Sequence, residues 1–114
     1  MSEKLLDENL LLSYLKDLGK DILKQMIDLY QQQSQIYLDD INRSVIEQSS
    51  SAWQEHCHKM KGAAGSVGLK SLYRYLVTIE KSDASREEKL SMVNKLTEQN
   101  DAGVAAFLIW LNTV

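Results

Sequence analysis

The stretch SAWQEHCHKMKGAAGSVG, residues 51–68, shows the helical pattern of this chain more clearly than any other. At about 100° per residue its large apolar side chains fall into one narrow arc. We take this arc as the face turned to the core; it comprises Trp53, Cys57, Met60, Ala64 and Val67. A helix with one apolar face needs neighbouring helices to cover that face, so the stretch predicts a helical bundle.

Four other segments share this periodicity and are separated by glycine or serine. The chain has no proline, and no part of it alternates with period two, so we expect no sheet. The predicted fold is all-α: an antiparallel up-and-down four-helix bundle with an additional short N-terminal helix across one end. The expected helices span residues 5–15, 21–48, 51–68 and 70–81, with a long last helix that opens at residue 85.

Several positions carry more specific expectations. Ser51 with Gln54, and Ser85 with Glu88, have the spacing of capping boxes at helix N-termini. Asn100 falls near the apolar stripe of the last helix, and we interpret it as partly exposed. In the second helix, apolar residues near helical spacing are Ile22, Met26, Leu29, Ile36 and Ile41.

Composition narrows the class of protein. The 114 residues are 44% hydrophobic and 25% charged, which predicts a single globular domain over residues 1–114. A net charge of −3 argues against nucleic-acid binding. A single cysteine, no signal-peptide pattern and no apolar run long enough to span a bilayer predict a soluble cytoplasmic protein without a membrane partner. A bundle with one site needs no dimer, so we expect a monomer.

The two histidines take different places on the predicted helix. His58 lies roughly 140° from the core arc and His56 roughly 60°, so His58 should face solvent while His56 edges the core or a neighbouring helix. Lys61, Gly62 and Gly65 share the outward side with His58. Because a glycine inside a helix costs about 1 kcal/mol relative to alanine, two glycines there indicate that something approaches the backbone closely.

This surface suits phosphoryl chemistry. A neutral imidazole is a nucleophile near neutral pH, and a lysine beside it could offset phosphoryl charge. His56 and His58 lie about 200° apart on the helix, so they cannot grip one metal ion, and we expect no metal. The chain has no nucleotide-binding glycine motif, so we expect a carrier without kinase activity of its own.

The run His58-Lys59-Met60-Lys61-Gly62, with Gly68 further on, resembles the signature of histidine-containing phosphotransfer (HPt) domains. The resemblance covers nearly the whole chain, although Ala63 and Cys57 depart from the commonest pattern. The length and the N-terminal helix are similar to those of stand-alone members that act in quorum-sensing phosphorelays.

The resemblance implies a four-helix bundle and a phosphorelay function. His58 would accept a phosphoryl group from an aspartate in the receiver domain of a hybrid sensor kinase. It would pass the group to the receiver domain of a response regulator. Lys61 would stabilise the phosphoryl charge, and Gly62 would leave room for the docking partner. The receiver would bring magnesium, so the chain itself needs no cofactor.

Two alternatives remain open from the sequence. A helical adaptor would dock receivers through the same face without chemistry, and a metal-dependent helical enzyme would hold stoichiometric zinc. The predicted partner-binding residues are Gly62, Gly65, Lys59, Lys70 and Arg74. The three basic residues form either a solvated face or a rim that steers an acidic receiver pocket.

Overall fold

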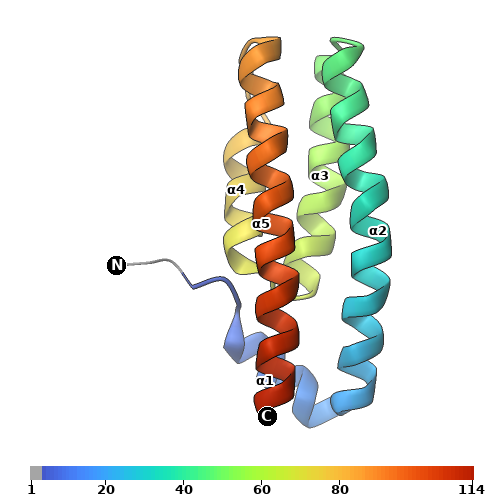
Figure 1. Cartoon of the computed structure of the whole chain (residues 1–114), viewed down its shortest axis with the longest axis vertical. Helices are drawn as coiled ribbons and strands as arrows, with labels where there is room; N and C mark the ends of the chain where they lie inside the picture. Colours follow the sequence, from blue (N-terminus) through green and yellow to red (C-terminus); the bar gives the residue numbers. More distant parts are fainter. Residues whose placement is uncertain (1–3) are drawn as a thin grey trace.

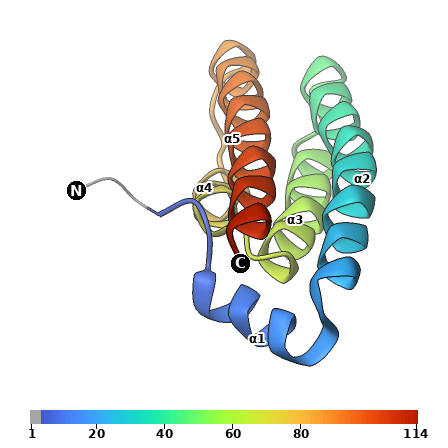
Figure 2. The ribbon, with the colours of Figure 1, turned by 60° about the horizontal axis from the view of Figure 1, so that its bottom comes forward.

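The computed structural model describes residues 4–114, which fold into helices with no strand among them (Figure 1). Helices α2, α3, α4 and α5 form an antiparallel bundle, in which each helix packs against two of the others. The short helix α1 crosses one end of this bundle (Figure 2). The predicted all-α bundle with an extra N-terminal helix is therefore confirmed. The helices are α1 Glu8–Leu18, α2 Lys20–Ile46, α3 Ser50–Ser66, α4 Lys70–Ile79 and α5 Arg86–Thr113.

The core face predicted for α3 is confirmed, since every residue of that arc is buried. Trp53, the largest of them, is 1% exposed, and its indole Nε1 donates a hydrogen bond of 2.9 Å to the carbonyl of Ile79 in α4. Burying an indole is favourable when its N–H keeps a partner. This contact fixes the rotation of α3 about its own axis, and so determines which residues face outward.

The interpretation of α2 is wrong for three of its five residues, whereas Ile41 is buried and Met26 packs against the core. Ile22, Leu29 and Ile36 are 41%, 62% and 56% exposed. The helix carries a second apolar series, and this one is buried because it faces both α3 and α5. Its apolar members are Leu23, Ile27, Tyr30, Leu38, Ile41 and Val45. The three exposed residues, spaced by seven, form an outer apolar stripe on α2.

The ends of the helices agree in part with the predicted caps. Ser85 accepts a hydrogen bond from the amide of Glu88 at 3.2 Å, as expected. The N-cap of α3 is Ser49 rather than Ser51, because the helix begins at Ser50 and the Ser49 hydroxyl accepts from the amide of Ala52. At the N-terminus, Asp7 caps α1 by accepting from Leu10, which displaces that helix from the predicted range 5–15.

Asn100 was expected to be partly exposed, but it is 1% exposed. Its Oδ1 accepts from the hydroxyl of Tyr30 at 2.7 Å, and its Nδ2 donates to the hydroxyl of Ser34 at 3.1 Å. A buried amide is tolerated when both of its ends are hydrogen-bonded. This polar network joins α5 to α2 within the core.

Helix α1 is tied to the turn between α3 and α4. The amide of Asp7 donates to the carbonyl of Gly68 at 2.9 Å, and the hydroxyl of Tyr14 donates to the carbonyl of Ser66. Gly68 has a φ of +76°, and a Cβ there would lie 2.9 Å from Leu11, so this turn requires glycine. These contacts hold the C-terminal end of α3 against α1.

Within residues 4–114, no helix combines the length and the apolar character that a membrane span requires.

Candidate functional site

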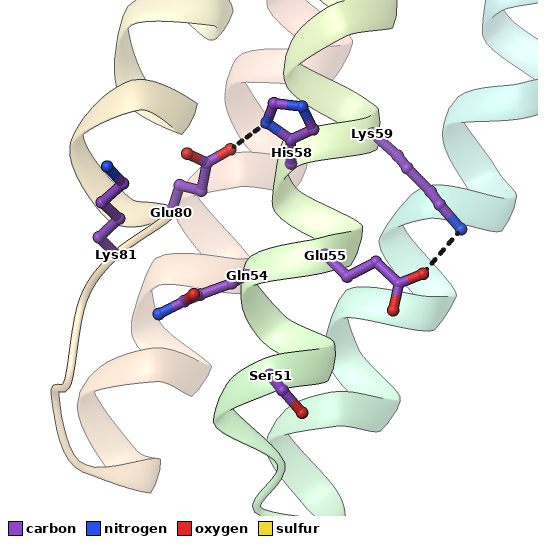
Figure 3. A pocket seen from close by; sticks show the side chains of 7 residues that line it. All are labelled: Ser51, Gln54, Glu55, His58, Lys59, Glu80 and Lys81. Atoms are coloured by element: carbon purple, nitrogen blue, oxygen red, sulfur yellow. Dashed lines mark hydrogen bonds and ion pairs between the residues drawn. The ribbon is translucent and has the colours of Figure 1, made fainter.

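His58 lies on the outer face of α3, opposite the buried residues Cys57 and Met60. Its side chain is 71% exposed, the degree of exposure that the helical wheel predicts. The imidazole borders an open pocket of about 410 Å³ between α3 and the end of α4 (Figure 3). The pocket is lined by Ser51, Gln54, Glu55, His58, Lys59, Glu80 and Lys81.

Glu80 directs the imidazole of His58. It is the C-cap residue of α4, and only 8% of it is exposed. Its Oε1 lies 2.9 Å from Nδ1 of His58, while the other ring nitrogen faces away from the carboxylate (Figure 3). An ionised carboxylate can only accept hydrogen bonds, so Nδ1 carries the proton in this contact. The lone pair of a neutral ring is then on Nε2, at the exposed side.

Lys61 binds the same carboxylate. Its Nζ lies 3.1 Å from Oε1 and 3.2 Å from Oε2 of Glu80, and its side chain is 19% exposed. Burial by itself raises the pKa of Glu80, but the hydrogen bonds from Lys61 and His58 outweigh burial and lower that pKa below its ordinary value. The buried carboxylate is therefore ionised at neutral pH and keeps its negative charge beside His58.

The two glycines of the outer face differ in their surroundings. A Cβ added at Gly62 would meet nothing within 4 Å, so the surface one turn after His58 is open. A Cβ added at Gly65 would lie 3.1 Å from the ring of Tyr73. The packing of Tyr73 therefore favours glycine at position 65, and this contact was not evident from the sequence. Only Gly62 fits the prediction of a helix glycine without a structural need.

His56 is separated from this site, as predicted. It faces α2, where its Nδ1 lies 3.9 Å from Oδ2 of Asp40, and its side chain is 24% exposed. Among residues 4–114 no group of three or more His, Cys, Asp or Glu side chains is arranged to hold a metal ion.

The predicted basic residues are spread over two helices. Lys59 lies next to His58 and pairs with Glu55 at 3.4 Å. Lys70 is the first residue of α4 and lines a different hollow, beside Gly65 and Gly68. Arg74 is exposed one turn further along α4. The structure thus brings Lys59, Lys61 and Gly62 together with His58, whereas Lys70 and Arg74 lie in the first half of α4, before the end that carries Glu80.

Sequence reasoning did not single out Glu80, although one signal for it exists. An acidic residue at a helix C-terminus faces the negative end of the helix dipole, which is a local cost. Glu80 occupies this position directly after the buried Ile79. Such a cost indicates that cationic side chains lie nearby. In the structure these are Lys61 and His58 of α3.

Comparisons with known proteins indicate the family of this chain. Residues 25–106 match the Hpt domain family. The aerobic respiration control sensor protein ArcB of Escherichia coli (strain K12) and of Shigella flexneri is 32% identical over 82 residues. That alignment covers 72% of this chain but 10% of each relative, so the chain corresponds to a small part of those proteins.

Solved structures show the same fold. The histidine-containing phosphotransfer domain of ArcB from Escherichia coli superposes with a TM-score of 0.85 at 24% identity, covering 96% of this chain and 94% of that one. A solution structure of the ArcB domain has a TM-score of 0.83 at 26% identity, covering 97% and 90%. Since the family match spans more than half of the sequence, the chain belongs to the Hpt domain family, whose members exchange phosphoryl groups with receiver domains in two-component phosphorelays.

Proposed function

We propose that His58 is the phosphoacceptor of this chain and that Nε2 is its reactive atom. The observation that carries the proposal is the contact of 2.9 Å between Nδ1 of His58 and the buried carboxylate of Glu80. A carboxylate that fixes one imidazole nitrogen leaves the other as the nucleophile, the logic by which a third group orients the base in catalytic triads. The 71% exposure of the side chain leaves Nε2 open to a partner.

The transfer step can be written on these atoms. The lone pair of Nε2 attacks the phosphorus of an aspartyl phosphate on a receiver domain, an N–P bond forms, and the P–O bond to the aspartate breaks. The aspartate leaves as a carboxylate. The ring then holds a phosphoryl group on Nε2 and a proton on Nδ1, so positive charge develops on the imidazole. Glu80 offsets that charge, and passage to a second receiver reverses these steps.

Lys61 serves this site in two ways under the proposal. In the structure it binds Glu80 and so keeps the buried carboxylate ionised. The predicted role of stabilising the phosphoryl charge requires its Nζ to turn toward Nε2 once the phosphoryl group is present. Both roles use the same cation, because Nζ lies one helical turn from His58 on the same side of α3.

The docking face of the receiver is proposed to extend from His58 across α3 to α2. At 100° per residue, Gly62 lies about 40° and Ser66 about 80° around α3 from His58. Beyond these small residues lies an apolar groove of about 290 Å³ between α3 and α2. Its wall includes Leu29, which is 62% exposed. Continuity of this groove with the histidine, over a surface of small side chains, supports a receiver domain as its occupant.

The basic residues Lys59, Lys70 and Arg74 remain predicted contacts on the rim of this face. Lys59 is adjacent to His58 and exposed, which supports its inclusion. For Arg74 the support is exposure on α4 next to Tyr73, whose ring packs on Gly65. Lys70 is half-buried, and its support is its place in the hollow beside Gly65 and Tyr73. Magnesium would come with the receiver.

The place of the chain in a pathway is the finer part of the proposal. The donor would be the receiver of a hybrid sensor kinase and the acceptor the receiver of a response regulator. Quorum sensing as the context rests on the resemblance of the sequence alone, and the relatives carry a name from respiration control. A single domain over residues 1–114, a monomeric state and a cytoplasmic location remain predictions.

Phosphoryl transfer from a purified, phosphorylated receiver tests the proposal on the wild type, His58→Gln and His56→Gln. We expect label on the wild type and on His56→Gln, none on His58→Gln, and a bond that is labile in acid and stable in alkali. If no variant takes label while a receiver still binds, the chain is the non-catalytic adaptor instead. His56→Gln controls for the loss of a histidine from the same helix.

A further inference from the structure

A second pocket lies at the end of the bundle away from α1, at the top of Figure 1. Its volume is about 210 Å³, and it opens between the turn joining α2 to α3 and the first turns of α5. No residue of this wall is an Asp or Glu, and its charged side chains are cations. The polar and charged wall consists of Ser44, Gln48, Ser49, Ser50, Arg86 and Lys89. Both charged side chains that line the pocket are therefore positive, although the chain has a net charge of −3.

Lys89 is the unusual member of this wall. It is 8% exposed, and its Nζ lies 5.0 Å from the centroid of the Trp53 ring. Within the described residues its contact is with the ring of Trp53, and no hydrogen bond or ion pair joins this ammonium to a carboxylate. An ammonium has three donors and is strongly hydrated, so an aromatic face replaces only part of what burial removes. The Nζ of Lys89 is not one of the buried nitrogen atoms that lack a partner, so it reaches the open side of the pocket, where a bound anion would replace water as its acceptor.

The N-terminus of α3 adds further donors at the same place. The amide of Trp53 makes the first backbone hydrogen bond of the helix, to the carbonyl of Ser49, and the Ser49 hydroxyl caps Ala52. The amides of Ser50 and Ser51 precede these bonds and belong to the unsatisfied donors of a helix start. The first turn of α3 has no acidic residue to offset the helix dipole, whereas the first turn of α5 has two.

We propose that this pocket binds a small oxyanion of the size of inorganic phosphate. Such an ion offers acceptors in several directions at once, which suits the ammonium of Lys89, the guanidinium of Arg86 and the amides at the start of α3. Its charge balances a buried cation that has no carboxylate beside it. The site uses none of the residues proposed for phosphotransfer, so the two proposals stand separately.

Titration of the full chain with inorganic phosphate, followed by backbone amide NMR, tests this proposal. Sodium chloride at matched ionic strength is the reference. We expect saturable shifts at the amides of Ser50 and Ser51 and at the indole N–H of Trp53. Lys89→Met should weaken phosphate binding roughly tenfold or more, the loss expected for one charge-assisted hydrogen bond.

Lys95→Met is the matched control. Lys95 is also on α5 and also stacks on an aromatic ring, with its Nζ 5.0 Å from the centroid of Tyr75, but it does not line the pocket. Phosphate binding should be unchanged in Lys95→Met. It should also be unchanged in His58→Gln, which separates this pocket from the phosphotransfer site. If Lys89→Met fails to fold, the exposed Arg86→Gln replaces it, with weaker binding expected again.

The outcomes divide clearly. Saturable shifts with phosphate and sulfate that are reduced in Lys89→Met but not in Lys95→Met support an oxyanion site. Shifts that fail to saturate, or that are equally reduced in both lysine variants, overturn it. Acetate that binds as tightly as phosphate also overturns it, because the pocket would then select charge rather than an oxyanion of that shape.

Discussion

The carboxylate of Glu80 lies 2.9 Å from Nδ1 of His58, although 22 residues separate the two in the chain. Glu80 sits at the end of α4 and His58 in the middle of α3, so only the packing of these helices brings them together. The contact determines which nitrogen of an exposed imidazole stays free. The chemistry of the site therefore depends on a residue outside the motif that carries the histidine.

Replacing Glu80 by Gln should slow phosphoryl transfer to His58 roughly tenfold, which corresponds to about 1.4 kcal/mol in the activation barrier. Glutamine keeps the shape of the side chain but cannot offset the positive charge that develops on the ring. The tautomer of His58, read from its ring nitrogen NMR shifts, should become mixed. Glu87→Gln, an exposed change in the first turn of α5, is the control. An unchanged rate together with an unchanged tautomer would remove Glu80 from the mechanism.

The lowered pKa of Glu80 makes a prediction about stability and pH. Hydrogen bonds from Lys61 and His58, outweighing burial, hold this pKa below its ordinary value of 4.5. A carboxyl whose folded pKa is lowered stabilises the fold above its unfolded pKa, and loses that contribution as the pH falls through the folded value. The difference in unfolding free energy between wild type and Glu80→Gln should thus be largest near neutral pH and shrink in acid.

Chemical denaturation at several pH values measures this difference. Lys61→Met provides a second test. Burial raises the pKa of Glu80, and without the lysine fewer hydrogen bonds counteract that effect. The pKa of Glu80, followed by carboxyl NMR, should then rise. If the pKa of Glu80 is the same in Lys61→Met as in the wild type, Lys61 does not keep this carboxylate ionised.

Gly62→Ala should stabilise the protein and impair transfer. A Cβ at this position meets nothing within 4 Å, so the folded chain should gain roughly 0.5–1 kcal/mol from the better helix former. The same methyl group stands where the receiver is proposed to approach, so transfer should slow. Thermal unfolding and transfer rates measure the two effects. Gly65→Ala is the contrasting variant, since its Cβ would press on Tyr73 and cancel the gain in stability. Full transfer activity in Gly62→Ala would show that the receiver does not approach there.

Leu29→Ser tests the docking face on α2. The side chain is 62% exposed, so its loss should change the unfolding free energy by no more than about 0.5 kcal/mol. Receiver binding should weaken roughly tenfold if Leu29 is a central contact. Calorimetric titration with the receiver measures this change. Ile109→Ser, a change at a residue 66% exposed on α5, should leave binding intact. Equal losses in the two variants would contradict a docking face on α2.

The all-α bundle and the orientation of α3 were predictable because one amphipathic pattern dominates residues 51–68. The register of α2 was not, because that helix carries two apolar series and only the positions of α3 and α5 determine which one is buried. Asn100 was misjudged for a related reason: a polar residue in an apolar stripe can be buried when partners on another helix satisfy it, here Tyr30 and Ser34.

The residues of the site likewise fall into those that the sequence could predict and those that it could not. His58, Lys61 and Gly62 follow one another on a single helix, so their common face could be worked out from the angle per residue. Glu80 comes from another helix, and its contact with His58 depends on how α4 packs on α3. The packing of Tyr73 on Gly65 was missed for the same reason.

Cys57, the neighbour of His58 in the sequence, is fully buried on the core side of α3. Burial, with a smaller contribution from the charge of Glu80, raises the pKa of its thiol to about 12. Oxidants and disulfides react with thiolates, and a thiol with such a raised pKa forms almost no thiolate at neutral pH. The thiol on the helix that carries the proposed phosphoacceptor is thereby protected from oxidants and from disulfide exchange.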